Sequence, residues 1–372
     1  MSPTHPLRLL GAILAVRPMP ADLAAALAAP DLDWPGLIQT AGQQLVTPSL
    51  ADALRRQGLF DTLPAELRDY LDGMRDLNRL RNRDLRSALE DIARALNPLG
   101  LQPVLLKGAN ALLPDQYPGA QDRVIGDLDL GIPPLRLAAA EGALLNLGYP
   151  PPVTVASTSP RLPWEPDRHH SPSLRHPTRP VTVELHRRLV ADVRDAARLQ
   201  AGLTTTPRTL AAGSAVLVPD PGTRLLHNFL HAQIQDRLRW RRRLNLRQLL
   251  DFAALAHRHP HALTPALLGR LRPRRRRALL DYLAQAEHWL GLAYPPALPR
   301  TASARWELWL QGLVLTSAGW RRLPTALETG ATLVGRLARL PLRLVLTPGW
   351  LPWRLRVWRD ARSMGFRWRG PR

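Results

Sequence analysis

Two aspartates in the middle of the chain carry the clearest chemical signal. Asp127 and Asp129 lie two residues apart in RVIGDLDLGI, residues 123–132, which has the alternation of a β-strand. Side chains two residues apart on a strand point to the same face. Two carboxylates on one face repel each other unless a cation compensates them, and a hard divalent ion such as Mg2+ or Mn2+ suits carboxylate ligands. The spacing therefore predicts a metal site at Asp127 and Asp129.

A third carboxylate, Glu184, follows on the strand-like segment VTVELH, residues 181–186. If this strand pairs beside the strand of the two aspartates, three carboxylates surround the site. Three carboxylates around two metal ions suit in-line phosphoryl or nucleotidyl transfer. His186 lies two residues beyond Glu184 on the same face. The sequence leaves open whether His186 has a catalytic or substrate-binding role or is a buried core histidine.

Lys107 is the sole lysine among 51 lysines and arginines. Lysine is a compact point charge, whereas arginine is a wide planar fork, so a tight site for one phosphate or carboxylate oxygen requires lysine. Lys107 and Gly108 lie between an apolar segment over 102–106 and the start of a helical pattern. A glycine at such a turn lets backbone N–H groups approach a phosphate. We interpret Lys107 as a phosphate-binding residue, with chance survival of one lysine codon as the alternative.

The surrounding patterns predict an α+β fold with a small mixed-sheet core between helical N- and C-terminal regions. Leucines recur at helix spacing from Leu77 to Leu96, whereas strand-like patterns concentrate between residues 100 and 190. We divide the chain into a helical N-terminal region (1–99), a catalytic core (100–190), a helical domain (191–340) and a basic Trp/Arg-rich C-terminal arm (341–372).

An ordered set of motifs resembles a known family. The set comprises Leu106-Lys107-Gly108, Tyr117-Pro118, Arg123, Asp127-Leu128-Asp129, Leu147-Gly148-Tyr149, His169-His170, Val183-Glu184-Leu185-His186 and His227-x-x-x-His231 leading to Asp251. It is similar to the uncharacterised bacterial nucleotidyltransferases within the DNA polymerase β-type superfamily, some of which are encoded in peptide natural-product and exopolysaccharide gene clusters. The chain departs from the superfamily at Gly108-Ala109, where Gly-Gly or Gly-Ser is usual.

The resemblance implies a Mg2+-dependent (or Mn2+-dependent) enzyme that moves NMP from an NTP to a small-molecule, peptide or protein acceptor. By this resemblance Asp127 and Asp129 bind the metals that hold the NTP, and Glu184 completes the second metal site. Lys107 and Arg123 contact phosphates, with Gly108 beside them. An ion pair between Arg123 and Asp127 is the structural alternative for that arginine.

The remaining histidines form two groups. We assign His170 and His186 to substrate binding, and His169 is a further candidate beside His170. His227 and His231 lie one helical turn apart, a spacing that also suits zinc. The sequence shows no nearby carboxylate partner for them, so we favour packing against the core.

Composition limits the partners. The net charge of +21 favours polyanions, yet no nucleic-acid-binding motif occurs, so we do not expect a nucleic-acid partner. Cysteine is absent, which excludes disulfides and thiol catalysis. The alternating Trp and Arg of the C-terminal arm fit either peripheral membrane contact or packing on the body. We expect a cytoplasmic protein without a membrane span.

Two alternatives to the leading function stay open. One is a nucleotide-binding scaffold of a biosynthetic complex that keeps the fold but turns over weakly. The other is a nucleic-acid-directed transferase, which the positive charge favours.

Overall fold

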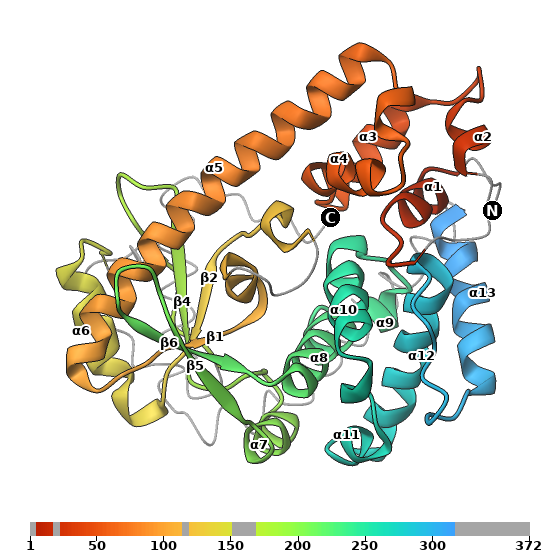
Figure 1. The fold of residues 1–372 in the computed structure, drawn as a ribbon. Helices are drawn as coiled ribbons and strands as arrows, with labels where there is room; N and C mark the ends of the chain where they lie inside the picture. The colour runs from red at the N-terminus through yellow and green to blue at the C-terminus, as the bar shows by residue number, and fades with distance from the viewer. Residues whose placement is uncertain (1–4, 18–22, 114–118, 151–168, 317–372) are drawn as a thin grey trace, which may run out of the picture.

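The computed structural model describes residues 5–17, 23–113, 119–150 and 169–316, and the C-terminal arm 341–372 lies outside them. The chain begins with helices, as predicted (Figure 1). Their bounds are α1 Pro6–Ile13, α2 Leu23–Leu27, α3 Trp34–Gln43, α4 Thr47–Arg56 and the 32-residue α5 Ala65–Leu96. Within the described ranges, no helix is both long and apolar enough to cross a membrane.

A six-stranded mixed sheet follows, in the order β3-β4-β2-β1-β6-β5. Its strands are β1 Val104–Leu105, β2 Leu128–Gly131, β3 Leu174–Arg175, β4 Thr182–His186, β5 Thr205–Thr209 and β6 Ala215–Pro219. Strand β2 pairs antiparallel with β1 and parallel with β4, and β1 pairs parallel with β6. The sheet between helical regions confirms the predicted α+β fold class.

The sheet does not stop at residue 190, where we expected the strands to end. Strands β5 and β6 lie beyond it and form one edge of the sheet. The segment Ala215–Pro219 is a short apolar run, and such a run cannot be assigned to a strand or a helix by periodicity alone. Its partner β1 decides the assignment, because Val104 pairs with Leu217.

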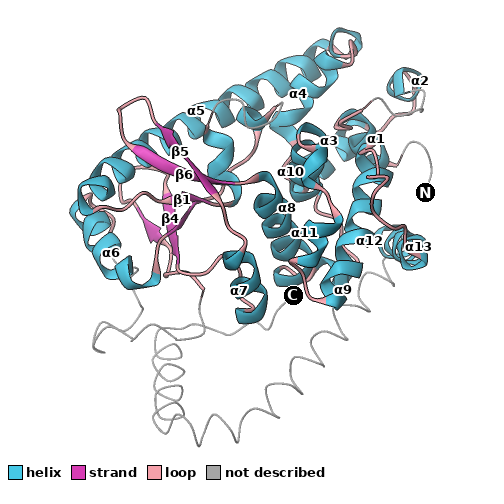
Figure 2. Cartoon of the chain, turned by 60° about the horizontal axis from the view of Figure 1, so that its bottom comes forward, coloured by secondary structure: helices cyan, strands magenta, loops and turns pink. Residues whose placement is uncertain are grey.

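Two helices cover one face of the sheet (Figure 2). They are α5 and α6, Leu137–Asn146, and a 3-10 turn, Pro134–Arg136, precedes α6. Apolar side chains of α5, α6 and the strands form one hydrophobic core, which includes Leu89, Leu144 and Val183. On the opposite face, Val104 of β1 packs against a second hydrophobic core.

Helix α5 also contacts the loop that leads into β2. Leu77 and Leu80 are 63% and 52% exposed, although their spacing matches the buried leucines nearer the helix end. The buried residues at this level are Asn78 and Asn82, whose amides donate to backbone carbonyls of residues 121–123 at 3.0–3.3 Å. The middle of α5 therefore positions a loop through polar contacts.

The rest of the described chain is mostly helical. The helices are α7 Val193–Ala201, α8 Pro221–Phe229, α9 Leu238–Arg241, α10 Leu246–Arg258, α11 Pro265–Gly269, α12 Pro273–Leu290 and α13 Ala302–Thr316. A π-helical turn, Leu230–Gln235, extends α8. The first and last helices share one hydrophobic core, in which Leu10 and Ile13 belong to the same cluster as Phe252 and Trp289.

Candidate active site

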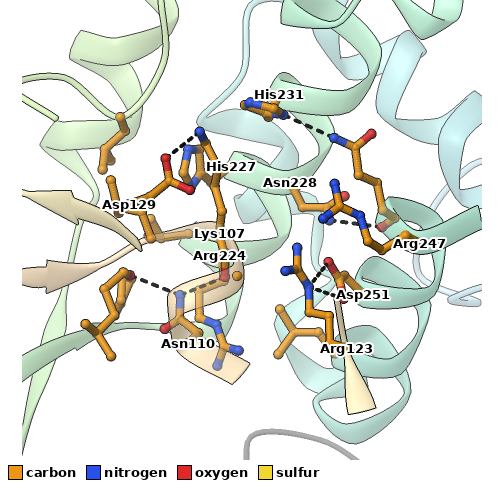
Figure 3. A pocket seen from close by; sticks show the side chains of 18 of the residues that line it. Lys107, Asn110, Arg123, Asp129, Arg224, His227, Asn228, His231, Arg247 and Asp251 are labelled. Atoms are coloured by element: carbon orange, nitrogen blue, oxygen red, sulfur yellow. Dashed lines mark hydrogen bonds and ion pairs between the residues drawn. The ribbon is translucent and has the colours of Figure 1, made fainter. Parts of the chain in front are cut away.

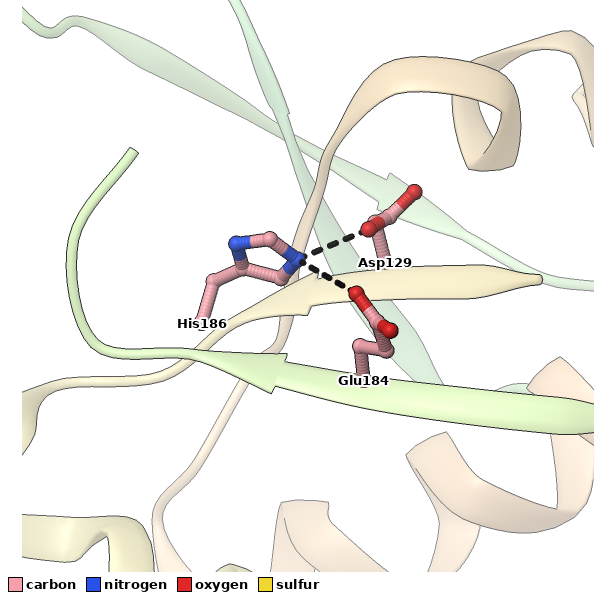
Figure 4. A group of neighbouring side chains, drawn as sticks. All are labelled: Asp129, Glu184 and His186. Carbon is pink, nitrogen blue, oxygen red and sulfur yellow. Dashed lines mark hydrogen bonds and ion pairs between the residues drawn. The ribbon is translucent and has the colours of Figure 1, made fainter. Parts of the chain in front are cut away.

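Two neighbouring strands bring Asp129 and Glu184 together. Strands β2 and β4 run parallel with Asp129 opposite Glu184. Leu128 and Leu130 of β2 lie in the core beneath α5. Because side chains alternate along a strand, Asp129 points to the opposite face of the sheet. The same alternation in β4 brings Glu184 and His186 to that face (Figure 4).

His186 lies between the two carboxylates. Its Nε2 is 2.7 Å from Asp129 Oδ1 and 3.7 Å from Glu184 Oε2. One ligand atom from each of the three residues lies within 4.8 Å of the others, an arrangement that suits a metal ion. The Ser173 hydroxyl donates to Glu184 Oε1 at 2.7 Å and orients that carboxylate. A group of two carboxylates and one imidazole therefore stands on the polar face of the sheet.

Lys107 approaches the same carboxylate from the turn after β1. Its Nζ donates to Asp129 Oδ1 at 2.7 Å. Lys107 begins the 3-10 helix Lys107–Leu112, and its φ of 44° lies in the left-handed region. This conformation costs a non-glycine residue on the order of 1–3 kcal/mol and is frequent at functional sites. The backbone at Lys107 is thus held in an unfavourable conformation beside the carboxylates.

Asp129 and Glu184 both have lowered pKa values. Burial alone would raise the pKa of Asp129, which is 1% exposed, but the His186 hydrogen bond and the Lys107 charge hold it well below its usual range. Burial also opposes ionisation of Glu184, yet the nearby His186 ring and the hydrogen bond from Ser173 lower its pKa to about 2. Both groups are therefore anionic at neutral pH.

Asp127 occupies a different position from the other predicted ligands. It directly precedes β2, is half-buried and lines the cavity next to Asp129. Burial raises the pKa of Asp127, and the Asp129 charge raises it further. Among the described residues, the three ligand atoms that cluster within 4.8 Å come from Asp129, Glu184 and His186, without Asp127. A cation bound here would need to draw Asp127 closer to use all three predicted carboxylates.

A cavity of about 270 Å3 opens beside Asp129 (Figure 3). One wall is the sheet and the turn that carries Lys107, Gly108 and Asn110. The other wall comes from α8 and α10 and includes residues that sequence reasoning did not assign to the site. They are Arg224, Asn228, Arg247 and Gln248. The sequence does contain a signal for this wall, because Arg224 and Asn228 are polar residues four positions apart and therefore lie on one face of a helix.

Arg123 pairs with Asp251 of α10 rather than with Asp127. Its Nε lies 2.7 Å and 2.9 Å from the two Asp251 carboxylate oxygens, and both side chains are largely buried. Gly108 lies directly against the Arg123 guanidinium, so that a Cβ at residue 108 would collide with Nη1. Gly108 thus permits Arg123 to connect the turn after β1 to α10.

We expect Arg123→Ala to destabilise the protein by about 3 kcal/mol or more, because the change removes one partner of a largely buried ion pair. Urea unfolding monitored by circular dichroism measures this loss. Arg258→Ala, at the exposed end of α10, is the matched control and should change stability by less than about 0.5 kcal/mol. Equal stability of the two variants would show that the Arg123–Asp251 pair contributes little.

The other histidines lie near the carboxylates. The rings of His169 and His170 are 4.4 Å apart, and both lie within 5.4 Å of the His186 ring. His170 Nδ1 is 3.6 Å from Glu184 Oε2. Burial, with the charge of His170, lowers the pKa of His169 to about 3, so that His169 is neutral at neutral pH.

His227 and His231 line the α8 wall of the cavity. His231 Nδ1 lies 3.2 Å from Asp236 Oδ2, a carboxylate neighbour that the sequence did not reveal. Burial lowers the pKa of His227 well below its usual value. In the described parts of the chain, these two histidines belong to no metal-competent group of three ligands.

Two carboxylates and one imidazole beside a cavity with several basic lining residues form a site that could hold a cation. The family model described as uncharacterised nucleotidyltransferase matches residues 30–291. The match spans more than half of the chain, and the protein belongs to the uncharacterised nucleotidyltransferase family. Comparison with curated proteins and with solved structures gave no match. Family membership supports a role in nucleotidyl transfer.

Proposed function

We propose that the protein is a divalent-cation-dependent nucleotidyltransferase that moves NMP from an NTP to an acceptor. The observation that carries the proposal is that Asp129, which lines the cavity with Lys107, lies next to both Glu184 and Lys107 in a chain of this family. In the transfer, an acceptor hydroxyl oxygen bonds to the α-phosphorus while the bond to the leaving pyrophosphate breaks.

The residues present fit a divalent cation. Asp129 and Glu184 offer anionic oxygens, and His186 offers a nitrogen within the same 4.8 Å group. Mg2+ or Mn2+ bound there would neutralise phosphate charge and orient the triphosphate. Lys107 would then hold a phosphate oxygen, and Glu184 would help to deprotonate the acceptor hydroxyl. His170 borders Glu184 and would contact the acceptor.

The acceptor is a small molecule, peptide or protein, and we place the reaction in natural-product or polysaccharide biosynthesis in the cytoplasm. Release of pyrophosphate from each of the four NTPs, in the presence of candidate acceptors and Mg2+ or Mn2+, tests the proposal. Asp129→Asn serves as the inactive control. Nucleotide binding without pyrophosphate release by any combination would favour the scaffold function, for which the absence of a serine after Gly108 is the specific argument.

The charge of the chain keeps a nucleic-acid-directed function as the second alternative. The observation behind it is the net charge of +21. Oligonucleotide binding that weakens steeply with salt would indicate contacts with several phosphates. If pyrophosphate release depends on an added oligonucleotide, the acceptor is a nucleic acid and not a small molecule, peptide or protein.

The imidazole of His186 leads to a prediction about metal preference. Both ions prefer oxygen ligands, but Mn2+ is a first-row transition metal and tolerates an imidazole nitrogen better than the harder Mg2+ does. We therefore expect His186→Asn to weaken Mn2+ binding by about tenfold or more while Mg2+ binding changes less. Electron paramagnetic resonance of free Mn2+, with Mg2+ as competitor, measures both affinities without turnover. A parallel loss of both affinities would show that His186 orients the carboxylates instead of contacting the ion.

A further inference from the structure

Arg247 is a largely buried cation that forms no ion pair within the described ranges, although the charges of Asp251, Asp127 and Asp236 act on it from a distance. It lies in the first turn of α10, across the cavity from Lys107 and Asp129 (Figure 3). Its Nη1 donates to the Val124 carbonyl at 3.0 Å, whereas its Nε is buried and has no hydrogen-bond partner within the described residues. Asp251, one helical turn away, binds Arg123 instead. Arg123 is thus paired with Asp251, whereas Arg247 forms no ion pair among the described residues.

Burying the Arg247 guanidinium without an ion-pair partner is unfavourable in free energy. Burial lowers the pKa of Arg247, and the neighbouring Arg123 charge lowers it further. A guanidinium nevertheless stays protonated in proteins, so the cost cannot be relieved by losing a proton. Burying a charge without a partner is unfavourable, and an anion from outside the chain removes that cost. Arg247 therefore has the properties of a ligand-binding arginine.

Two side chains near Arg247 also have a buried polar atom for which the described residues provide no hydrogen-bond partner. Gln248 Oε1 and His227 Nε2 are buried, and the part of the chain that the structure describes gives neither a hydrogen-bond partner. Both residues are more than nine-tenths buried and line the same cavity as Arg247. Buried polar atoms in proteins are nearly always hydrogen-bonded. Three unsatisfied groups on one wall indicate that a polar ligand completes it.

We propose that Arg247 binds the triphosphate of the NTP, as a second anion contact across the cavity from Lys107. The inference rests on the proposed nucleotidyl transfer and adds a residue from α10 to the nucleotide site. The planar fork of arginine matches two phosphate oxygens at once, whereas Lys107 contacts one. Both side chains line the same cavity, and we place the triphosphate between them.

Calorimetry on the full chain tests the inference with inorganic tripolyphosphate, non-hydrolysable analogues of the four NTPs, and adenosine, all with Mg2+. The variants are R247M, which keeps the length of the side chain, and R247K, which keeps its charge. R258M, exposed at the other end of the same helix, is the matched control. We expect R247M to weaken tripolyphosphate binding tenfold or more, R247K to weaken it less, and R258M to bind like wild type.

Thermal unfolding separates binding from a structural role. R247M should unfold at the same temperature as wild type or higher, because an unpaired buried cation has been removed. A lower unfolding temperature with unchanged tripolyphosphate affinity would make Arg247 a structural residue that holds the Val124 carbonyl, and would overturn the inference. If R247M does not fold, wild-type affinity in R247K and in an R247Q variant would overturn it equally.

The outcomes also distinguish the inference from the proposed function. Wild-type binding of tripolyphosphate that R247M leaves unchanged overturns the Arg247 contact and leaves nucleotidyl transfer standing. An equal loss of adenosine and NTP-analogue affinity in R247M places Arg247 at the nucleoside and overturns the phosphate contact. If the wild-type chain binds neither tripolyphosphate nor any NTP analogue, both the inference and the proposed function fall.

Discussion

Asp129→Asn is expected to lower NTP-dependent pyrophosphate release by about a hundredfold or more, which is the loss typical of removing one central electrostatic group. Asp129 is the point at which the cationic Lys107 and the ring of His186 meet, each 2.7 Å from the same carboxylate oxygen. An asparagine there has no charge to hold a divalent ion and leaves Lys107 uncompensated. Steady-state measurement with saturating NTP and metal checks the result.

Changing Asp127 as well as Asp129 should abolish NTP binding in addition to turnover. We expect the double variant Asp127→Asn, Asp129→Asn to lose binding of a non-hydrolysable NTP in the presence of Mg2+, as followed by calorimetry. Asp91→Asn, on α5 and away from the cavity, is the control for removal of a partly buried carboxylate. Unchanged nucleotide affinity in the double variant would contradict the assignment of the metal site.

Lys107→Arg is expected to reduce turnover tenfold or more, about 1.4 kcal/mol of transition-state stabilisation, with little change in melting temperature. The charge is kept, but a guanidinium is wider than an ammonium and cannot occupy the space beside Asp129 without moving the triphosphate. Small displacements of reacting groups cost rate heavily. The comparison of kcat for the two proteins, with unfolding curves as control, measures the effect.

The composition of the chain offers a second measurement at the same residue. Lys107 is the sole side-chain amine, so an acylating reagent followed by mass spectrometry reports on this position alone among the side chains. We expect a bound NTP analogue to protect Lys107 from acylation. Full activity of Lys107→Arg, or acylation unaffected by nucleotide, would remove Lys107 from the phosphate site.

The strands and the helix that support the site are predictable from the sequence, because each is indicated by the residue pattern of a single segment. The alternation around Asp129 and Glu184 predicts two strands, and the structure pairs those strands with the two carboxylates side by side. The same alternation places His186 on the polar face, although its distance from Asp129 depends on how the strands are paired. The α-helical pattern from Leu77 to Leu96 likewise predicts α5, since helix spacing is a property of one segment.

The unpredicted features depend on contacts between distant segments. Sequence proximity suggested Asp127 as the partner of Arg123, but the actual partner, Asp251, is 128 residues away and is brought close by the packing of α10. Asn78 was unremarkable in the sequence, because its role comes from the carbonyls of a loop 44 residues further on. No local pattern encodes such pairs, and the α8 and α10 wall of the cavity is absent from sequence reasoning for the same reason.

The shared core of the first and last helices has a consequence for synthesis on the ribosome. Leu10 and Ile13 can complete their packing only after Phe252 and Trp289 have been translated, since these residues belong to one cluster. At roughly 5–20 residues per second, the part of α1 that packs on α12 remains uncovered for more than ten seconds. Nascent chains of this protein should therefore engage chaperones that bind exposed apolar segments, and release from them should follow the emergence of α12.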